Sequence, residues 1–277
     1  MNNFTKRLIF GLIYVLVVVI ATSTNTFAFI FIFLGFLLFC TYELNNILKL
    51  KSIIPYFLNS ALFITIALRF LNLNYDLFNI NIELSKINLL VVLSFILISF
   101  ISVLFSKEKE PIKKLGNIFL SFIYIGVPFS LIWDIYGTDL IRPNNSINII
   151  LGVFILIWTN DTFAYLVGRK FGKHKLFERI SPKKTIEGFI GGIIFTLIAG
   201  YFISKFNYTY TTLFWLILAF IVSVFGTIGD LIESMFKRDS NIKDSSNLIP
   251  GHGGFLDRLD SFIFAIPFIY IFLILLT

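Results

Sequence analysis

The stretch SMFKRDSNIKDSSNLIPGHGGFLDRLDS, residues 234–261, separates an apolar run over 211–233 from another that begins at residue 261. It gathers acids, bases, glycines and a histidine in a chain that is 57% hydrophobic and 14% charged, with a mean hydropathy of +0.88. These values lie far outside the range of ordinary water-soluble domains. The sequence therefore predicts an integral membrane protein in which this polar stretch connects two membrane helices.

Outward from this connector, apolar runs of about 20 residues recur along the chain, each long enough to cross a hydrocarbon core as a helix. We predict an all-α polytopic membrane protein with about nine transmembrane helices. The predicted spans are 8–23, 27–48, 53–72, 88–106, 115–135, 147–168, 189–207, 211–233 and 261–277. The first run follows Lys6 and Arg7 without a convincing small-residue cleavage site, so we expect a retained helix rather than a secretory signal.

The distribution of basic residues predicts the orientation. Cytoplasmic connecting segments are rich in Lys and Arg, and with a cytoplasmic N-terminus all but four of the 23 Lys and Arg residues fall on the inner side. The exceptions are Arg69, Lys86, Arg142 and Lys205. The same asymmetry accounts for the net charge of +7, so this charge does not indicate a nucleic-acid partner. Cys40 is the single cysteine, which excludes an intrachain disulfide.

The chain changes character near residue 146. Residues 1–146 are predicted to form a transmembrane scaffold without chemistry of its own, including a solvated connector, KEKEPIKK, at 107–114. Residues 147–277 carry polar groups inside or at the ends of apolar runs, where a carboxylate costs about 2.5–3.5 kcal/mol near the bilayer centre. We expect this second part to be a transmembrane catalytic region with its site on the cytoplasmic side.

Acidic residues share helical faces on either side of the connector. Asp257 and Asp260 are three residues apart, and Asp230, Ser234 and Lys237 step by four and three, so each set projects from one face. The alternative for any single acid is that it caps a helix at the membrane interface. Together, the two faces and the interleaved bases suit hard cations and phosphate oxygens. These bases are Lys237, Arg238, Lys243 and Arg258.

Two further segments suggest ligand contacts. The glycines of PGHGGF, residues 250–255, let the backbone approach a ligand closely. His252 within it is either a ligand-contacting residue or a hydrogen-bonded structural residue. Upstream, SPKKTIEG at 181–188 combines hydroxyls, adjacent cations and a carboxylate, and we expect it to bind phosphate. Glycines 188, 191 and 192 permit either close helix packing or ligand approach. The Walker pattern GxxxxGK[ST] does not occur in the sequence.

The connector resembles, along its whole length, the signature of the phosphatidate cytidylyltransferases, the CDP-diacylglycerol synthases. The matching residues are Ser234, Lys237, Arg238, Lys243, Asp244, His252, Gly253, Gly254, Asp257, Arg258 and Asp260. NDTFAYLVGRKFGKHK at 160–175, ISPKKTIEGFIGG at 180–192 and GDLIES at 229–234 are also similar to segments of that family. The resemblance is close over roughly residues 150–277, whereas the first 145 residues agree only as a generic membrane bundle.

The resemblance implies transfer of CMP from CTP to phosphatidate, giving CDP-diacylglycerol and pyrophosphate in phospholipid biosynthesis. It implies Mg2+ as cofactor, with a second cation left open, and we expect Asp230, Asp257 and Asp260 as metal ligands. The catalytic residues would be Asp230, Lys237, Arg238, Lys243, Asp257, Arg258 and Asp260. The substrate-binding residues would be Ser181, Lys183, Lys184, Thr185, Glu187, Ser234, Asp244, His252, Gly253 and Gly254.

The expected partners are CTP, phosphatidate, the lipid bilayer and a second copy of the chain in a homodimer, with no nucleic acid. The expected location is the inner or plasma membrane of a bacterium, or an organellar membrane, with the active site facing the cytoplasm. One alternative is a CTP-dependent polyprenol or dolichol kinase, which would transfer the γ-phosphate. A cation-coupled transporter is an alternative from a different class, although we find no inverted repeat in the sequence.

Overall fold

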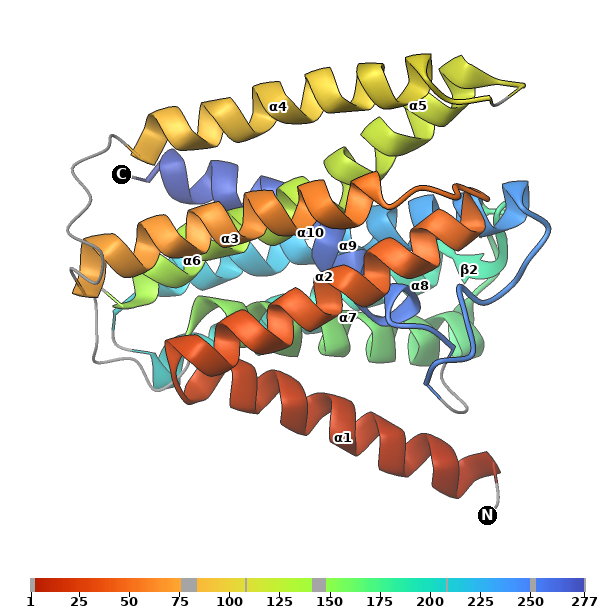
Figure 1. Ribbon diagram of the computed structural model, residues 1–277. Coiled ribbons are helices and arrows are strands. Elements are labelled where there is room, and N and C mark those ends of the chain that lie inside the picture. The colour runs from red at the N-terminus through yellow and green to blue at the C-terminus, as the bar shows by residue number, and fades with distance from the viewer. Residues whose placement is uncertain are drawn as a thin grey trace.

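The computed structural model describes residues 3–75, 84–107, 109–140, 148–207, 209–249 and 253–276 (Figure 1). Most of these residues are helical. The helices are α1 (Asn3–Ser23), α2 (Thr26–Ile47), α3 (Ile54–Tyr75), α4 (Leu84–Leu104), α5 (Pro111–Ser121), the π-helix η1 (Phe122–Gly126), α6 (Val127–Leu140), α7 (Ile149–Phe171), α8 (Ile186–Phe206), α9 (Thr212–Asp239) and α10 (Leu256–Ile274). The strands are β1 (Lys175–Phe177) and β2 (Ser181–Thr185).

Length and composition support a helical membrane protein. Within the described ranges, six helical segments are long and apolar enough to cross a membrane. They are Thr26–Ile47, Ile54–Leu71, Pro111–Gly137, Ile149–Phe171, Ile186–Phe206 and Thr212–Asp239. The apolar stretches Leu8–Ser23 in α1 and Leu89–Leu104 in α4 are shorter. Helix α10 overlaps the last predicted span, 261–277, but begins five residues earlier. The count of nine and the orientation of the N-terminus stay predictions.

The fold departs from the predicted all-α architecture at one short hairpin. Strands β1 and β2 pair antiparallel, with Lys175 opposite Thr185 and Phe177 opposite Ser181. Thr185 ends β2 and then caps α8, because its Oγ1 accepts a hydrogen bond from the Gly188 N–H at 3.1 Å. Strands of three and five residues are too brief to produce a recognisable alternation of apolar and polar residues.

Aromatic side chains fill the core where helices from both parts of the chain meet. Phe29 of α2 packs edge-on against Trp133 of α6, with ring centroids 5.1 Å apart, and Phe154 of α7 stacks on Phe262 of α10 at 4.4 Å. One cluster of buried residues includes all four rings. Cys40 is also fully buried in it, as expected for a packed small hydrophobe.

Close packing of α7 on α8 explains two of the glycines in the upstream segment. A Cβ on Gly188 would lie 2.7 Å from the carbonyl oxygen of Ala164, and one on Gly191 would lie 2.7 Å from the Val167 side chain. Such distances leave room only for a hydrogen atom. Of the two alternatives for these positions, the structure shows helix packing.

The polar connectors gather at one end of the bundle. Figure 1 shows the hairpin, the α9–α10 connector, the α2–α3 connector and the α4–α5 connector at the same end. Segments that are far apart in the sequence therefore meet at this end of the bundle (Figure 1).

Candidate active site

A buried cluster of three charges joins α9 to α10. Lys237 stands between two carboxylates: its ammonium group pairs with Glu233, one turn earlier, and donates to Asp257 Oδ1 at 2.5 Å. Glu233 is fully buried and Lys237 is 8% exposed. Buried charges persist where they are paired, so this arrangement fixes the end of α9 against the beginning of α10.

Asp257 also organises the glycine-rich loop before α10. Its Oδ2 accepts hydrogen bonds from the Ser245 N–H at 3.0 Å, the Ser245 hydroxyl at 3.0 Å and the Gly254 N–H at 2.8 Å. Gly253 has a φ of +85°, and a Cβ there would lie 2.5 Å from Asp257 Oδ2. The left-handed backbone and the close approach both require glycine at position 253.

Glu43 of α2 binds the same loop from the N-terminal part of the chain. This fully buried carboxylate accepts hydrogen bonds from the Ser245 hydroxyl at 2.8 Å, the Ser246 hydroxyl at 2.6 Å, and the N–H groups of Phe255 at 3.0 Å and Leu256 at 2.7 Å. Two of these donors are N–H groups at the start of α10, which have no intrahelical acceptor.

Sequence reasoning missed Glu43, because it assigned no chemistry to residues 1–146. The available signal was a lone carboxylate near the end of a long apolar run, 202 residues before Ser245. Gly254 contributes to the same contact, since a Cβ there would collide with Glu43 Oε2 and with the Ser245 hydroxyl. The second glycine of the pair therefore allows Glu43 to reach the loop.

An ion pair joins the hairpin segment to α9. Lys184 Nζ lies 2.7 Å from Asp230 Oδ2, and both side chains are partly exposed. Ser234, one turn later on α9, donates to Asp230 Oδ1 at 3.3 Å. The structure thus brings together Lys184, Asp230 and Ser234, which the sequence placed in two separate segments.

Asp260 lies beside the same part of α9 but deeper. It is 7% exposed, and its Oδ1 accepts the N–H of Ser261 at 2.6 Å. The backbones of the two helices are in contact here, because a Cβ on Gly229 would lie 2.6 Å from the Asp260 carbonyl oxygen. Asp230 and Asp260 are therefore presented by adjoining turns of α9 and α10.

Two predicted site residues, Arg238 from the catalytic set and Glu187 from the substrate-binding set, have protein partners. Arg238 donates to the carbonyl oxygens of Ile180 at 3.3 Å and Ile242 at 3.0 Å, which ties the hairpin to the end of α9. Glu187 accepts the N–H of Lys173 at 3.0 Å and the Nδ1 group of His174 at 2.7 Å. His174 received no role from the sequence, because its acidic partner lies 13 residues away.

Other predicted residues remain accessible at the same end. Lys183, Lys243, Asp244 and Arg258 are exposed, and Ser181 is half-buried. Within the described ranges, neither Lys183 nor Lys243 is paired with a carboxylate. His252 lies outside the described residues, so its predicted role stays a prediction.

The predicted metal ligands do not converge in this structure. Among the described residues, no three His, Cys, Asp or Glu side chains are grouped so that they could hold a metal ion. Asp230 and Asp260 supply carboxylate oxygens of the kind that Mg2+ prefers, from adjoining helix turns. Asp257 fits less well as placed, because its oxygens already accept from Lys237, Ser245 and Gly254.

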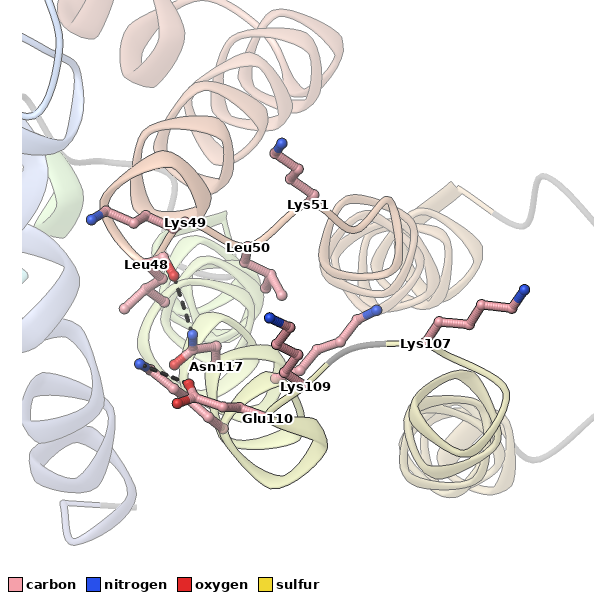
Figure 2. A pocket seen from close by; sticks show the side chains of 10 residues that line it. Leu48, Lys49, Leu50, Lys51, Lys107, Lys109, Glu110 and Asn117 are labelled. Atoms are coloured by element: carbon pink, nitrogen blue, oxygen red, sulfur yellow. Dashed lines mark hydrogen bonds and ion pairs between the residues drawn. The ribbon is translucent and has the colours of Figure 1, made fainter.

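A separate basic hollow lies beyond this cluster. A cavity of about 600 Å³ lies between the α2–α3 and α4–α5 connectors. Figure 2 shows its lining side chains, among which Lys49, Lys51 and Lys107 point in different directions. It is lined by Leu48, Lys49, Leu50, Lys51, Lys107, Lys109, Glu110, Lys113, Lys114 and Asn117. None of the residues predicted for catalysis lines it, so we place the candidate active site at the α9–α10 cluster.

The fold and the site define a helical membrane protein that concentrates carboxylates and ammonium groups at one end of its bundle. A family model described as "Cytidylyltransferase family" matches residues 5–276, and the chain belongs to this family. The match confirms the resemblance found in the sequence and extends it through the first 145 residues.

Curated relatives agree with this membership. The phosphatidate cytidylyltransferase of Staphylococcus haemolyticus is 42% identical over 196 residues, which cover 70% of each chain. That of Staphylococcus saprophyticus is 40% identical over 186 residues, covering 67% of this chain and 68% of the relative. That of Staphylococcus aureus strain COL is 39% identical over 199 residues, covering 70% and 71%.

Proposed function

We propose that this protein transfers CMP from CTP to phosphatidate, giving CDP-diacylglycerol and pyrophosphate for phospholipid synthesis. Family membership and the names of the relatives support the proposal. The structural observation that carries it is the Lys184–Asp230 ion pair at 2.7 Å, which joins the phosphate-binding candidate SPKKTIEG to the helix that opens the signature.

The reaction needs positive charge more than it needs a protein nucleophile. An oxygen of the lipid phosphate attacks the α-phosphorus of CTP, the new P–O bond forms, and the bond to the β-phosphate breaks to release pyrophosphate. Both reactants are anions, so cations must stabilise the charge that develops between them. The exposed ammonium groups of Lys183 and Lys243 are available for these phosphates. Lys184 belongs to β2 and Arg258 to the first turn of α10, the elements that border the candidate site.

We also propose a Mg2+ requirement, with a second cation left open. Asp230 and Asp260 would hold the ion, and Asp257 would join them by exchanging one of its present donors. A bound Mg2+ would neutralise phosphate oxygens and orient them. The remaining predicted residues would shape the substrate site: Ser181, Thr185, Glu187, Arg238, Asp244, Gly253 and Gly254. Three of them, Thr185, Glu187 and Arg238, would do so by holding the hairpin in place.

The proposed topology has nine membrane helices, a cytoplasmic N-terminus and a site that faces the cytoplasm. It is supported by Figure 1, where the lysine-rich connectors and the candidate site lie at the same end of the bundle. The division into a scaffold at 1–146 and a catalytic region at 147–277, the homodimer and the location in a bacterial inner membrane are part of the same proposal.

A label-transfer assay tests the function. Purified protein in phosphatidate-containing micelles receives CTP labelled at either the α- or the γ-phosphate, with and without a magnesium chelator. We expect label from the α position in a chloroform-soluble product, and its loss with the chelator. Label arriving only from the γ position would identify a lipid kinase. Substrate flux into liposomes without any labelled lipid would identify a transporter.

A further inference from the structure

Glu43 is a buried carboxylate to which the proposed chemistry gives no role. It lies near the end of α2, with every surface buried, and four donors from residues 245–256 surround it. An isolated charge in such a place is strongly unfavourable, whereas one with four donors is stabilised. Glu43 therefore depends on the loop before α10, and the loop depends on Glu43.

The contacts of Glu43 continue directly to the candidate active site. The Ser245 hydroxyl lies 2.8 Å from Glu43 Oε2 and 3.0 Å from Asp257 Oδ2, so it bridges the two carboxylates. Its one proton serves either acceptor, while the Ser245 N–H also donates to Asp257. Asp257 in turn holds the ammonium group of Lys237. The Ser245 hydroxyl thus connects Glu43 to Asp257, an acid predicted for catalysis.

One stripe along α2 contacts the signature region. Phe39 stacks on Phe255 with ring centroids 4.6 Å apart and an interplanar angle of 9°, and the Ile47 carbonyl accepts from the Ser240 hydroxyl at 2.6 Å. Phe39, Glu43 and Ile47 are spaced by four residues, which places them on one face of the helix. The loop before α10 packs against this face of α2.

We propose that Glu43 is a positioning residue for nucleotidyl transfer. It fixes the positions of Ser245 and of the first N–H groups of α10. Through these groups it determines the positions of the Asp257 and Lys237 side chains. This inference rests on the proposed function, because it concerns the efficiency of that reaction. It also gives part of the N-terminal region a role in catalysis, in place of the inert scaffold expected from the sequence.

The Glu43→Gln variant removes the negative charge of this side chain while keeping its volume. Its amide would present N–H donors toward a shell composed of donors, so the loop would shift although the packing of α2 is kept. We expect kcat to fall by about 10- to 100-fold, because displacements near 1 Å in an active site have effects of that size. The KM for phosphatidate should stay near the wild-type value. Glu110→Gln, at an exposed carboxylate, is the matched control and should keep wild-type kcat.

A double-mutant cycle with Ser245→Ala separates positioning from general stabilisation. If Glu43 acts through Ser245, the two losses in kcat overlap and the double variant is about as active as Glu43→Gln alone. The thermal unfolding midpoint of each variant is measured in the same detergent, and kcat is measured well below that midpoint. A lower kcat then cannot be due to global unfolding of the variant. If Glu43→Gln does not fold, Ser245→Ala alone carries the test and must lower kcat at an unchanged unfolding midpoint.

Two results would overturn the proposal: wild-type kcat in Glu43→Gln or in Ser245→Ala, or losses that simply multiply in the double variant. Neither result touches the proposed function, because that is tested by wild-type label transfer. An inactive wild-type protein would instead remove the proposed function and the positioning role together.

Discussion

Lys237 places one ammonium group between Glu233 and Asp257, and this cluster is withdrawn from solvent. Removing the cation would leave Glu233 as a buried carboxylate without its counter-ion, and would leave Asp257 only the neutral donors of Ser245 and Gly254. Lys237 therefore contributes both to the stability of the fold and to the candidate active site, whereas the exposed bases nearby, in the described part of the chain, are not part of a buried ion pair.

Replacement of this cation should destabilise the protein. We expect Lys237→Met to lower the free energy of unfolding by about 3–5 kcal/mol, because one partner of a buried ion pair is removed, and to abolish label transfer. Thermal unfolding in detergent measures the first effect. Lys243→Met, at an exposed position, serves as the stability control and should leave the unfolding midpoint unchanged. Equal midpoints for the two variants would contradict the importance of the buried cluster.

Gly253 should be intolerant of any side chain. Alanine at a positive φ costs about 1–2 kcal/mol, and its Cβ would also press on Asp257 Oδ2. We expect Gly253→Ala to lower both the unfolding midpoint and the rate of label transfer. Gly35→Ala in α2 is the matched control, because a Cβ there meets no atom within 4 Å. A fully active Gly253→Ala protein would show that the loop conformation is not needed.

The metal-binding proposal predicts loss of chemistry without loss of folding. Asp260→Asn keeps the shape of the side chain and should leave a membrane-inserted protein with almost no label transfer at any Mg2+ concentration, because a neutral amide is a poor Mg2+ ligand. Glu110→Asn is the exposed control. Wild-type turnover in Asp260→Asn would remove this residue from the site.

At the scale of elements, helical spacing predicted α9 well and the hairpin not at all. Asp230 and Ser234 do share one face, as their contact at 3.3 Å shows. The ammonium group of Lys237 pairs with Glu233 and Asp257. The hairpin was missed because its two strands have only three and five residues, too few for an alternation of apolar and polar residues to be recognised. Spacing within one segment can be read from a sequence, whereas the pairing of short segments depends on tertiary contacts.

The hairpin should loosen when its junction with α8 is broken. Thr185→Ala removes the cap on the Gly188 N–H, which costs about 1 kcal/mol. We expect faster amide hydrogen exchange in the first turn of α8 and in β2, with little change in the α9–α10 connector. Thr196→Ala, inside the same helix, is the comparison variant and should leave exchange in the first turn unaltered. Unchanged exchange in both variants would contradict the capping role.

At the scale of the whole molecule, composition predicted the class and the signature located most of the site. What could not be predicted was which distant residues complete it. Nothing local to Glu43 marks it as a partner of Ser245, and the packing of α2 against the α9–α10 connector exists only in the folded chain. The predicted metal ligands show the same limit, since adjacency in sequence does not reveal that Asp257 is held by Lys237.

The proposed orientation predicts the accessibility of engineered cysteines. Cys40 is fully buried, so the wild-type protein provides a low background for a membrane-impermeant maleimide. We expect Lys109→Cys to react only from the cytoplasmic side of sealed vesicles and Lys205→Cys only from the opposite side. Both cysteines reacting from one side would contradict the proposed topology.

The contact between Glu43 and the start of α10 also has a consequence for biosynthesis. Translation delivers Glu43 to the membrane before its hydrogen-bond donors exist, because Phe255 and Leu256 follow it by 212 and 213 residues. Until they arrive, α2 carries a carboxylate that the lipid environment does not favour. The shell of donors around Glu43 is therefore complete only when α10 has joined the bundle, and a nascent chain that stops short of α10 keeps this carboxylate without two of its four donors.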